Sequence, residues 1–372
     1  MKFYGVHEGL YEGVQTRIDS LRSACTELGV EYVDIDSLTF DYTAIPKLTK
    51  QDMLYSISRG SGSLISLMLN AEVTTFYKCN PELNLITSTT EWSIVHEKRG
   101  LSAPKTIFSL TADRARLVRY VEYLGGFPIV LKVVGGTRGI GTIKAESWHS
   151  LLSMADYLVG IGARFILRQF IEAEYGVRAL VIGKEVVACS RFYFQENDFR
   201  NAAILARASY ELHQLDGVSE GLCIAAVDEI GLEMGGVDIL YDKTGVPYLL
   251  EVNFPVGFQS FQERGPAIAR AMVAHLVTKA QRRRAIYTIQ HTWILSSGFS
   301  KQQSDEVMNC FACCPLTGYL TLGAAMGRTR WLWQRWGQLC SELIVTQSFY
   351  KMQLDWRGAI KGCGSFIRML SV

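Results

Sequence analysis

The pattern of apolar and polar positions predicts a chain that mixes strands and helices over its first 280 residues. Short apolar or alternating runs are typical of strands. They occur at residues 2–6, 31–35, 127–134, 142–144, 164–172, 175–182, 185–191, 235–241 and 246–252. Helical periodicity is predicted at residues 14–28, 111–124 and 266–281, with a loop at 58–63 that enters a helix ending at Leu69. We expect Thr111 to cap the second of these helices and Gly125-Gly126 to end it.

The last two predicted strands form a hairpin that carries polar residues on one face. Residues 242–245 supply the turn. Because successive side chains of a strand point to opposite faces, Glu251 and Asn253 share a face while Val252 points into the core. In this pairing Asp238 lies across from them. Two carboxylates and an amide oxygen suit Mg²⁺, which is usually bound together with substrate phosphates. A hairpin whose polar face meets solvent would show the same pattern.

A glycine-rich turn joins two of the upstream strands. The apolar strand 127–134 carries Lys132 near its end and runs into residues 135–141, which contain four glycines. Such a turn brings backbone N–H groups close to phosphate oxygens, and Lys132 would add a positive charge. No helix opens from the glycines and no Gly-Lys-Ser/Thr ends the turn, so the segment is neither a Rossmann fingerprint nor a Walker A loop.

A third segment, Arg164 to Arg191, reads as three successive strands. Within it, Gln169 is followed by Phe170 and Ile171, a polar edge beside apolar walls that is suited to clasping adenine. The three segments follow one another within about 130 residues, and this order is more specific than any one of them.

These segments resemble the ATP-grasp ligases, most closely the RimK-type glutamate ligases. The resemblance rests on FPIVLKVVGGTRGIGT, LRQFIEAEYGVRALVIGKEVVACSRF, NDFRN and GGVDIL…GVPYLLEVNFPVGF, and it covers residues 100–280 most strongly. It implies an α/β (α+β) architecture: a small N-terminal α/β domain, an ATP-grasp domain and an atypical C-terminal tail. The expected domains are 1–100, 101–281 (lobes 101–185 and 186–281) and 282–372.

The resemblance also implies a reaction and a set of site residues. Members of the family use ATP to join a carboxylate to an amine through an acyl phosphate. Phosphates would be held by Lys132, Gly136, Thr137, Arg138, Gly139 and Gly141. Adenine would be held by Gln169, Phe170 and Ile171, and Mg²⁺ by Asp238, Glu251 and Asn253. The acyl phosphate or substrate carboxylate would face Arg178, Arg200 and Asn201. Two Mg²⁺ ions are expected, with Mn²⁺ as a substitute.

The chain departs from the family pattern at three places near these residues. A lysine usual before the Pro-x-Thr at 104–106 is replaced in Ser88-Thr-Thr-Glu-Trp92. Gly176-Val177 stands where an acidic residue is expected, and residues 201–207 differ from the family's loop. A nucleotide-binding protein that has lost ligation is therefore the alternative function, and the identities of the amino acid, peptide or protein substrates stay open.

Composition separates the tail from the rest of the chain. The 372 residues have a net charge of +2, which gives no reason to expect nucleic acid as a partner. Residues 282–372 contain five of the nine cysteines and five of the seven tryptophans. The Cys310-x-x-Cys313-Cys314 cluster lacks a second pair at zinc-finger spacing. The uncharged run 307–327 makes a bilayer-spanning segment the minor alternative to a packed tail.

The last two expectations concern the compartment in which the protein works and its oligomeric state. The first residues have no uninterrupted apolar core of signal-peptide length, and nine cysteines without a regular framework fit a reducing compartment. The expected location is the cytoplasm, and the expected assembly is a homo-oligomer.

Overall fold

The computed structural model describes residues 1–81, 89–108, 111–134, 139–173, 175–194, 199 and 210–297. Residues 1–293 form one unit by their contacts. The tail features predicted beyond Ser297 lie outside the described residues. In the part of the chain that is described, no helix is long and apolar enough to cross a membrane.

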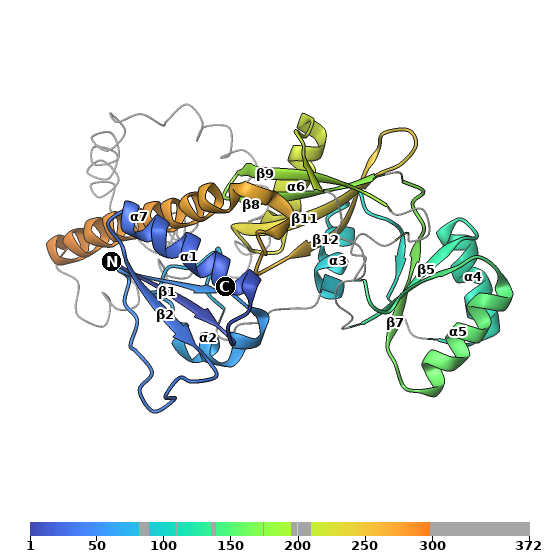
Figure 1. Ribbon diagram of the computed structural model, residues 1–372, viewed down its shortest axis with the longest axis horizontal. Coiled ribbons are helices and arrows are strands. Elements are labelled where there is room, and N and C mark those ends of the chain that lie inside the picture. The colour runs from blue at the N-terminus through green and yellow to red at the C-terminus, as the bar shows by residue number, and fades with distance from the viewer. Residues whose placement is uncertain are drawn as a thin grey trace, which may run out of the picture. The chain divides into compact units, whose positions relative to one another are not determined.

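The chain begins with a three-stranded parallel sheet, as the strand–helix–strand pattern predicts. Its order is β2-β1-β3, formed by β1 (Lys2–His7), β2 (Glu31–Asp36) and β3 (Asp52–Ser56). The helix α1 (Glu12–Glu27) connects the first two strands, and η1 (Arg59–Ser61) and α2 (Gly62–Met68) follow the third (Figure 1). Three or four residues separate the buried Val14, Ile18, Leu21 and Cys25 of α1, so one helical face covers the core.

A second sheet carries Lys132. Its order is β4-β7-β5-β6, formed by β4 (Thr106–Ile107), β5 (Ile129–Val133), β6 (Thr142–Ala145) and β7 (Phe165–Gln169), all antiparallel. The helices α4 (Arg114–Leu124) and α5 (Trp148–Gly160) cover one face (Figure 1). Ile129 and Leu131 pack in the core under these helices. Because side chains alternate, Val130 and Lys132 lie on the opposite face.

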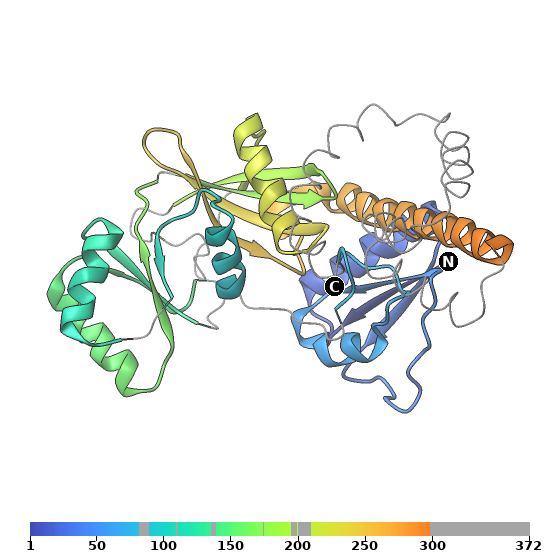
Figure 2. The same cartoon turned by 180° about the vertical axis from the view of Figure 1, so that it is seen from behind.

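A third sheet carries the hairpin that contains the predicted metal ligands Asp238, Glu251 and Asn253, called the metal hairpin below. Its order is β10-β9-β8-β11-β12. The strands are β8 (Tyr175–Ile182), β9 (Glu185–Tyr193), β10 (Tyr210–Leu212), β11 (Met234–Tyr241) and β12 (Pro247–Asn253). The neighbouring helices are α3 (Thr89–Lys98), α6 (Gly217–Glu229), η2 (Gln259–Arg264) and α7 (Gly265–Ser297) (Figure 2). The hairpin pairs in the predicted register, with Asp238 opposite Glu251.

Two helix ends differ from the sequence-based expectations. The residue that caps α4 is Asp113, whose carboxylate accepts a hydrogen bond from the N–H of Arg116 at 2.7 Å. Thr111, the predicted cap, instead accepts a hydrogen bond from the N–H of Asp113. Gly125 ends α4 in the left-handed region at φ 94°, as predicted. The helix α7 continues past residue 281 to Ser297, because arginine, which follows at 282–284, is a favourable helix residue.

Candidate active site

The hairpin of β11 and β12 brings three oxygen-bearing side chains together. Asp238 is fully buried, and Glu251 lies directly opposite it on β12. The amide nitrogen of Asn253 donates to Glu251 at 3.2 Å and to Asp238 at 3.3 Å. Val252 is fully buried on the other side of the strand, so the predicted alternation of faces is confirmed.

Lys132 lies against this group although it belongs to the other sheet. Its Nζ atom donates to Oε2 of Glu251 at 2.8 Å, and each side chain is about one-quarter exposed or less. The predicted phosphate ligand and a predicted metal ligand are therefore neighbours. A nucleotide held between the two sheets would meet both of them.

Arg178 forms a two-pronged contact with Asp238. Its Nε and Nη2 atoms donate to the two carboxylate oxygens, both at 2.6 Å, and Nη1 donates to the hydroxyl of Ser260 at 3.3 Å. Arg178 and Asp238 face each other on neighbouring strands, β8 and β11. The guanidinium thus lies within the candidate metal site, and the resemblance implies that the same side chain faces the acyl phosphate or the substrate carboxylate.

Two further arginines reach the same region, and neither was predicted from the sequence. Arg59, in η1, donates to Oδ1 of Asn253 at 3.3 Å and so links the N-terminal sheet to the metal hairpin. Arg168 is buried on β7 and donates to the backbone oxygen of Leu250, the residue before Glu251, at 3.2 Å. No local pattern marks either residue, because the contacts span 194 and 82 positions.

The pKa of Glu251 reflects its cationic neighbours. Burial alone would raise the pKa of this carboxyl, but the charge and hydrogen bond of Lys132 lower it, helped by Asn253 and Arg178. The net direction is downward, so Glu251 is ionised at neutral pH. Burial would lower the pKa of Arg178, but the charge and hydrogen bonds of Asp238 outweigh burial and raise it on balance, so this side chain stays charged as well.

The three oxygen-bearing residues fit a magnesium ion whose remaining ligands are phosphate oxygens and water. Two ionised carboxylates and one amide provide hard oxygen ligands from adjacent strand positions. Within the described ranges, no group of three or more His, Cys, Asp or Glu residues is placed to hold a metal ion. Phosphates and water would therefore have to complete the set of ligands. The amide nitrogen of Asn253 faces the carboxylates, so a bound cation would require the amide to turn its oxygen toward them.

The residues predicted to clasp adenine lie at the end of β7. The glycine-rich turn 135–141, called the phosphate turn below, leads into β6. Ile171 is buried, and the ring of Phe170 is covered by Nζ of Lys144 at 4.8 Å. The side chain of Gln169 accepts a hydrogen bond from the backbone N–H of Lys105 at 3.2 Å, so its oxygen is directed at β4. Residues 136–138, Arg200 and Asn201 lie outside the described residues.

The described end of the phosphate turn has the conformation that requires glycine. Gly139 and Gly141 have φ values of 74° and 78°. A Cβ atom added to Gly141 would lie 2.9 Å from the Cβ of Val133, so only glycine lets the turn close against β5.

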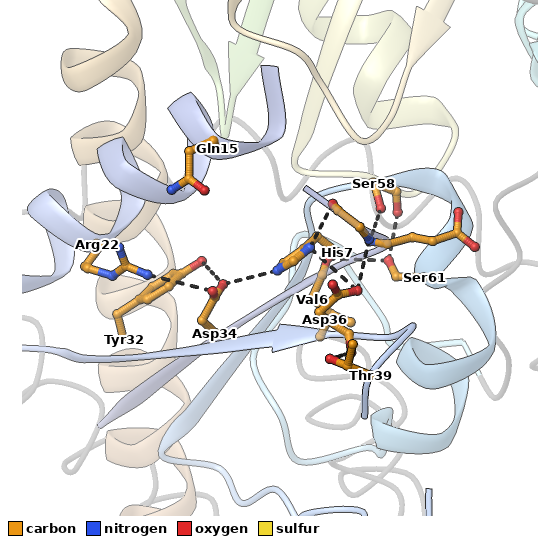
Figure 3. Close-up of polar contacts among 12 residues, drawn as sticks. Val6, His7, Gln15, Arg22, Tyr32, Asp34, Asp36, Thr39, Ser58 and Ser61 are labelled. Carbon is orange, nitrogen blue, oxygen red and sulfur yellow. Dashed lines mark hydrogen bonds and ion pairs between the residues drawn. The ribbon is translucent and has the colours of Figure 1, made fainter. Parts of the chain in front are cut away.

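A separate polar network surrounds the buried His7 at the carboxyl end of β1 (Figure 3). Nδ1 of His7 lies 3.1 Å from the backbone oxygen of Gly9, and Nε2 lies 3.6 Å from Asp34. Asp36 accepts a hydrogen bond from the N–H of Gly9 at 2.9 Å, and this bond lowers the pKa of Asp36. The network holds the turn after β1.

Comparison with known proteins agrees with this geometry. Residues 93–276 match the model of the RimK-like ATP-grasp domain. A probable alpha-L-glutamate ligase of Vibrio vulnificus is 29% identical over 184 residues, which are 49% of this chain and 60% of that protein. The probable alpha-L-glutamate ligase 1 of Shewanella baltica is 25% identical over 264 residues, covering 70% of this chain and 82% of that protein. The chain thus spans less than two-thirds of the Vibrio relative.

Solved structures show the same fold at lower sequence identity. The ATP-grasp ligase PsnB, in complex with a minimal precursor, Mg and ADP, has a TM-score of 0.56 and 19% identity, with 74% of this chain and 97% of that chain covered. The D-alanine–D-alanine ligase of Bacillus anthracis in complex with ATP has a TM-score of 0.55 and 15% identity, with 77% and 98% covered. The fold and the family match together identify residues 93–276 as a RimK-like ATP-grasp domain.

Proposed function

We propose that this protein is an ATP- and Mg²⁺-dependent ligase that joins a carboxylate to an amine through an acyl phosphate. The observation that carries the proposal is the position of Lys132 against Glu251, with Asp238, Asn253 and Arg178 beside it. Phosphoryl transfer asks a protein mainly for positioning and for neutralisation of charge, and this cluster provides both.

The bonds that change require no nucleophile from the protein. An oxygen of the substrate carboxylate attacks the γ-phosphorus of ATP, so that a new O–P bond forms and the bond to ADP breaks. The amine then attacks the acyl carbon, phosphate leaves, and the amine loses a proton. Magnesium, when bound, would neutralise phosphate charge.

Each described side chain has a part in this scheme. Lys132 would hold the phosphates, since an ammonium group acts as a point charge. Arg178 would orient the developing acyl phosphate, because its planar guanidinium can bind two oxygens at once. Glu251 and Asp238 would keep the metal in place.

The substrates follow from the names of the relatives and neighbours. Probable alpha-L-glutamate ligases share the sequence, and a ligase solved in complex with a precursor peptide shares the fold. We therefore propose an amino acid, a peptide or a protein as the source of both the carboxylate and the amine. Two Mg²⁺ ions, replaceable by Mn²⁺, would serve the reaction. We further propose a homo-oligomer that works in the cytoplasm without nucleic acid.

The test is an ATP turnover assay with pooled amino acids and short peptides, followed by mass spectrometry of the products. We expect ADP release together with a new amide. ATP hydrolysis without an amide in any pool, or no hydrolysis at all, would contradict the proposed ligation.

The alternative, a nucleotide-binding protein without ligation, is favoured by one observation. The first turn of α3 contains Glu91 and no basic residue, where the family pattern has a lysine. In that case ATP would bind, and no substrate pool would release ADP.

A further inference from the structure

The end of the metal hairpin is held against the N-terminal sheet by a buried arginine. Arg17, on α1, donates to the backbone oxygen of Ile57 at 2.7 Å and to that of Val256 at 3.2 Å. Ile57 directly follows β3, and Val256 lies shortly after Asn253, the last residue of β12. One side chain therefore fixes the segment that leads into Arg59 beside the segment that leaves the hairpin.

The turn that carries Arg59 is fixed in addition by buried serines. Oγ of Ser61 lies 2.8 Å from Oγ of Ser56 and donates to the backbone oxygen of Ser58 at 2.8 Å. Oγ of Ser58 accepts a hydrogen bond from the backbone N–H of Glu8 at 2.8 Å. All three serines are buried, whereas Arg59 is exposed. The backbone of this arginine is thus held firmly at the carboxyl end of the sheet, and its side chain is open to a ligand.

The other cations of the site already have carboxylate partners. Lys132 forms an ion pair with Glu251, and Arg178 forms one with Asp238. Burial lowers the pKa of Arg168, and the charge of Glu251 opposes that shift. The positive charge of these three residues is therefore compensated within the protein.

Arg59 has no carboxylate partner among the described residues. Its Nη2 atom donates to Oδ1 of Asn253 at 3.3 Å, and this acceptor is a neutral amide. Glu8 fills the space that a Cβ atom of Gly60 would occupy, but in the described part of the chain it forms no ion pair with Arg59. A guanidinium has five N–H donors. One bond to an amide leaves the charge of Arg59 and most of its donors available to an anion.

A carboxylate that approaches the γ-phosphate of ATP needs a cation of this kind. The two groups are both anionic, so they repel each other unless positive charge lies beside them. Arg59 is one hydrogen bond away from Asn253, a proposed metal ligand, and it enters the site from the N-terminal sheet. Its planar guanidinium can hold both oxygens of a carboxylate.

We propose that Arg59 binds the carboxylate that is to be activated, so that the N-terminal sheet takes part in substrate selection. This inference rests on the proposed ligation and names the residue that holds its acid. A bound cation would require Asn253 to turn its oxygen toward Asp238 and Glu251. That movement removes the present acceptor of Arg59 and releases the guanidinium for the substrate.

The test uses acetate, a carboxylate without other polar groups, as the probe. NMR measures the relaxation of its methyl protons with the full-length protein, ADP and Mn²⁺, whose unpaired electrons relax nearby protons. We expect faster relaxation than with Mn²⁺ and ADP alone. Arg59→Gln should weaken acetate binding about tenfold or more, because charged hydrogen bonds are lost. Arg59→Lys should weaken it less, since lysine keeps the charge but not the planar fork.

Two controls separate substrate binding from a structural role. Arg22→Gln removes the same charge at an exposed ion pair of α1 and should leave acetate affinity within about twofold of the wild type. The affinity for Mn²⁺ in the presence of ADP is measured from the electron paramagnetic resonance signal of free Mn²⁺. Arg59→Gln should keep or increase this affinity, because Asn253 can then turn more easily. If Arg59 only positioned Asn253 for the metal, Mn²⁺ affinity would fall.

Three results would each overturn the inference: no faster relaxation of acetate with the wild type, equal acetate affinity of Arg59→Gln and the wild type, or a loss of Mn²⁺ affinity in Arg59→Gln. None of these measurements uses turnover. Ligation by a protein whose acetate binding ignores Arg59 would refute this inference alone. Acetate held by Arg59 in a protein that forms no amide would refute the proposed function alone and support Arg59 as a carboxylate ligand.

Discussion

At the scale of single residues, the carboxylates of the metal hairpin are already paired with cations. Lys132 contacts Glu251 at 2.8 Å, and Arg178 contacts Asp238 at 2.6 Å. These pairs keep two neighbouring acids ionised, which a metal ligand must be. Binding of magnesium and ATP would therefore exchange one set of charge partners for another.

Replacement of Glu251 tests the role of the metal. Glu251→Gln keeps the shape of the side chain and removes its charge, so Mg²⁺-dependent ATP turnover should fall by at least a hundredfold. Titration of the initial rate with Mg²⁺ gives the measurement. Glu229→Gln, a change at a surface ion pair with Arg99, serves as the control. Turnover of Glu251→Gln close to that of the wild type would exclude Glu251 as a ligand.

Replacement of Lys132 tests nucleotide contact. Lys132→Met keeps most of the apolar stem and removes the ammonium. A hydrogen bond to a charged group is worth about 1.5–3 kcal/mol, so ATP affinity should fall about tenfold to a hundredfold. Calorimetry measures it, with Lys184→Met as a control at an exposed ion pair. Equal affinities of Lys132→Met and the wild type would place the phosphates elsewhere.

At the scale of elements, the phosphate turn depends on the close approach of Gly141 to β5. Gly141→Ala forces an alanine into the left-handed region and onto Val133. Gly125, at the end of α4, shares the positive φ but has no atom within 4 Å of an added Cβ, so Gly125→Ala is the matched control. Both substitutions carry a backbone cost of about 1–2 kcal/mol.

Only Gly141→Ala should impair the nucleotide site. We expect its KM for ATP to rise several-fold, while Gly125→Ala lowers the melting temperature and leaves KM unchanged. Equal KM values in the two variants would show that the turn tolerates a side chain at residue 141.

The helix α7 is tied to the sheet by Glu233. Its carboxylate lies 2.8 Å from Nζ of Lys279 and 3.0 Å from Nε2 of His275. Burial would raise the pKa of Glu233, but the hydrogen bond with His275 and the charge of Lys279 lower it on balance. A depressed folded-state pKa means that this carboxylate stabilises the fold above its unfolded pKa, about 4.3, and that the contribution disappears as the pH falls through the folded-state value.

The corresponding variant is Glu233→Gln. At pH 7 we expect its free energy of unfolding to be lower by about 1.5–3 kcal/mol, because a charged hydrogen-bond partner is lost. The difference from the wild type should shrink below about pH 4. Urea unfolding at several pH values provides the measurement. A difference that stays constant between pH 7 and pH 3 would show that the charge of Glu233 does not stabilise the helix.

At the scale of the whole molecule, contacts between residues that are close in the sequence could be predicted, whereas contacts between distant residues could not. The hairpin was predictable from its local turn and from strand alternation, but a β-bulge between Asp238 and Ile239, which neither signal predicts, sets the exact pairing of Asp238 with Glu251. The approach of Lys132 to Glu251 spans 119 positions and followed only from the family resemblance.

The remaining contacts depend on how separate elements pack. Arg59, Arg168 and Ser260 reach the site through contacts that span 75 to 194 positions, and alternation within one strand carries no information about such contacts. The N-terminus of α4 shows the same limit at short range, since Thr111 and Asp113 are both good caps and the entering backbone selects Asp113.

The central claim is that the carboxylate is activated by ATP as an acyl phosphate. The most direct measurement uses pooled amino acids and peptides whose carboxylates carry ¹⁸O, with mass spectrometry of the inorganic phosphate released. The proposed mechanism predicts one ¹⁸O atom in each phosphate, formed in step with ADP and a new amide. Phosphate without excess ¹⁸O, or the absence of any ADP, would contradict it.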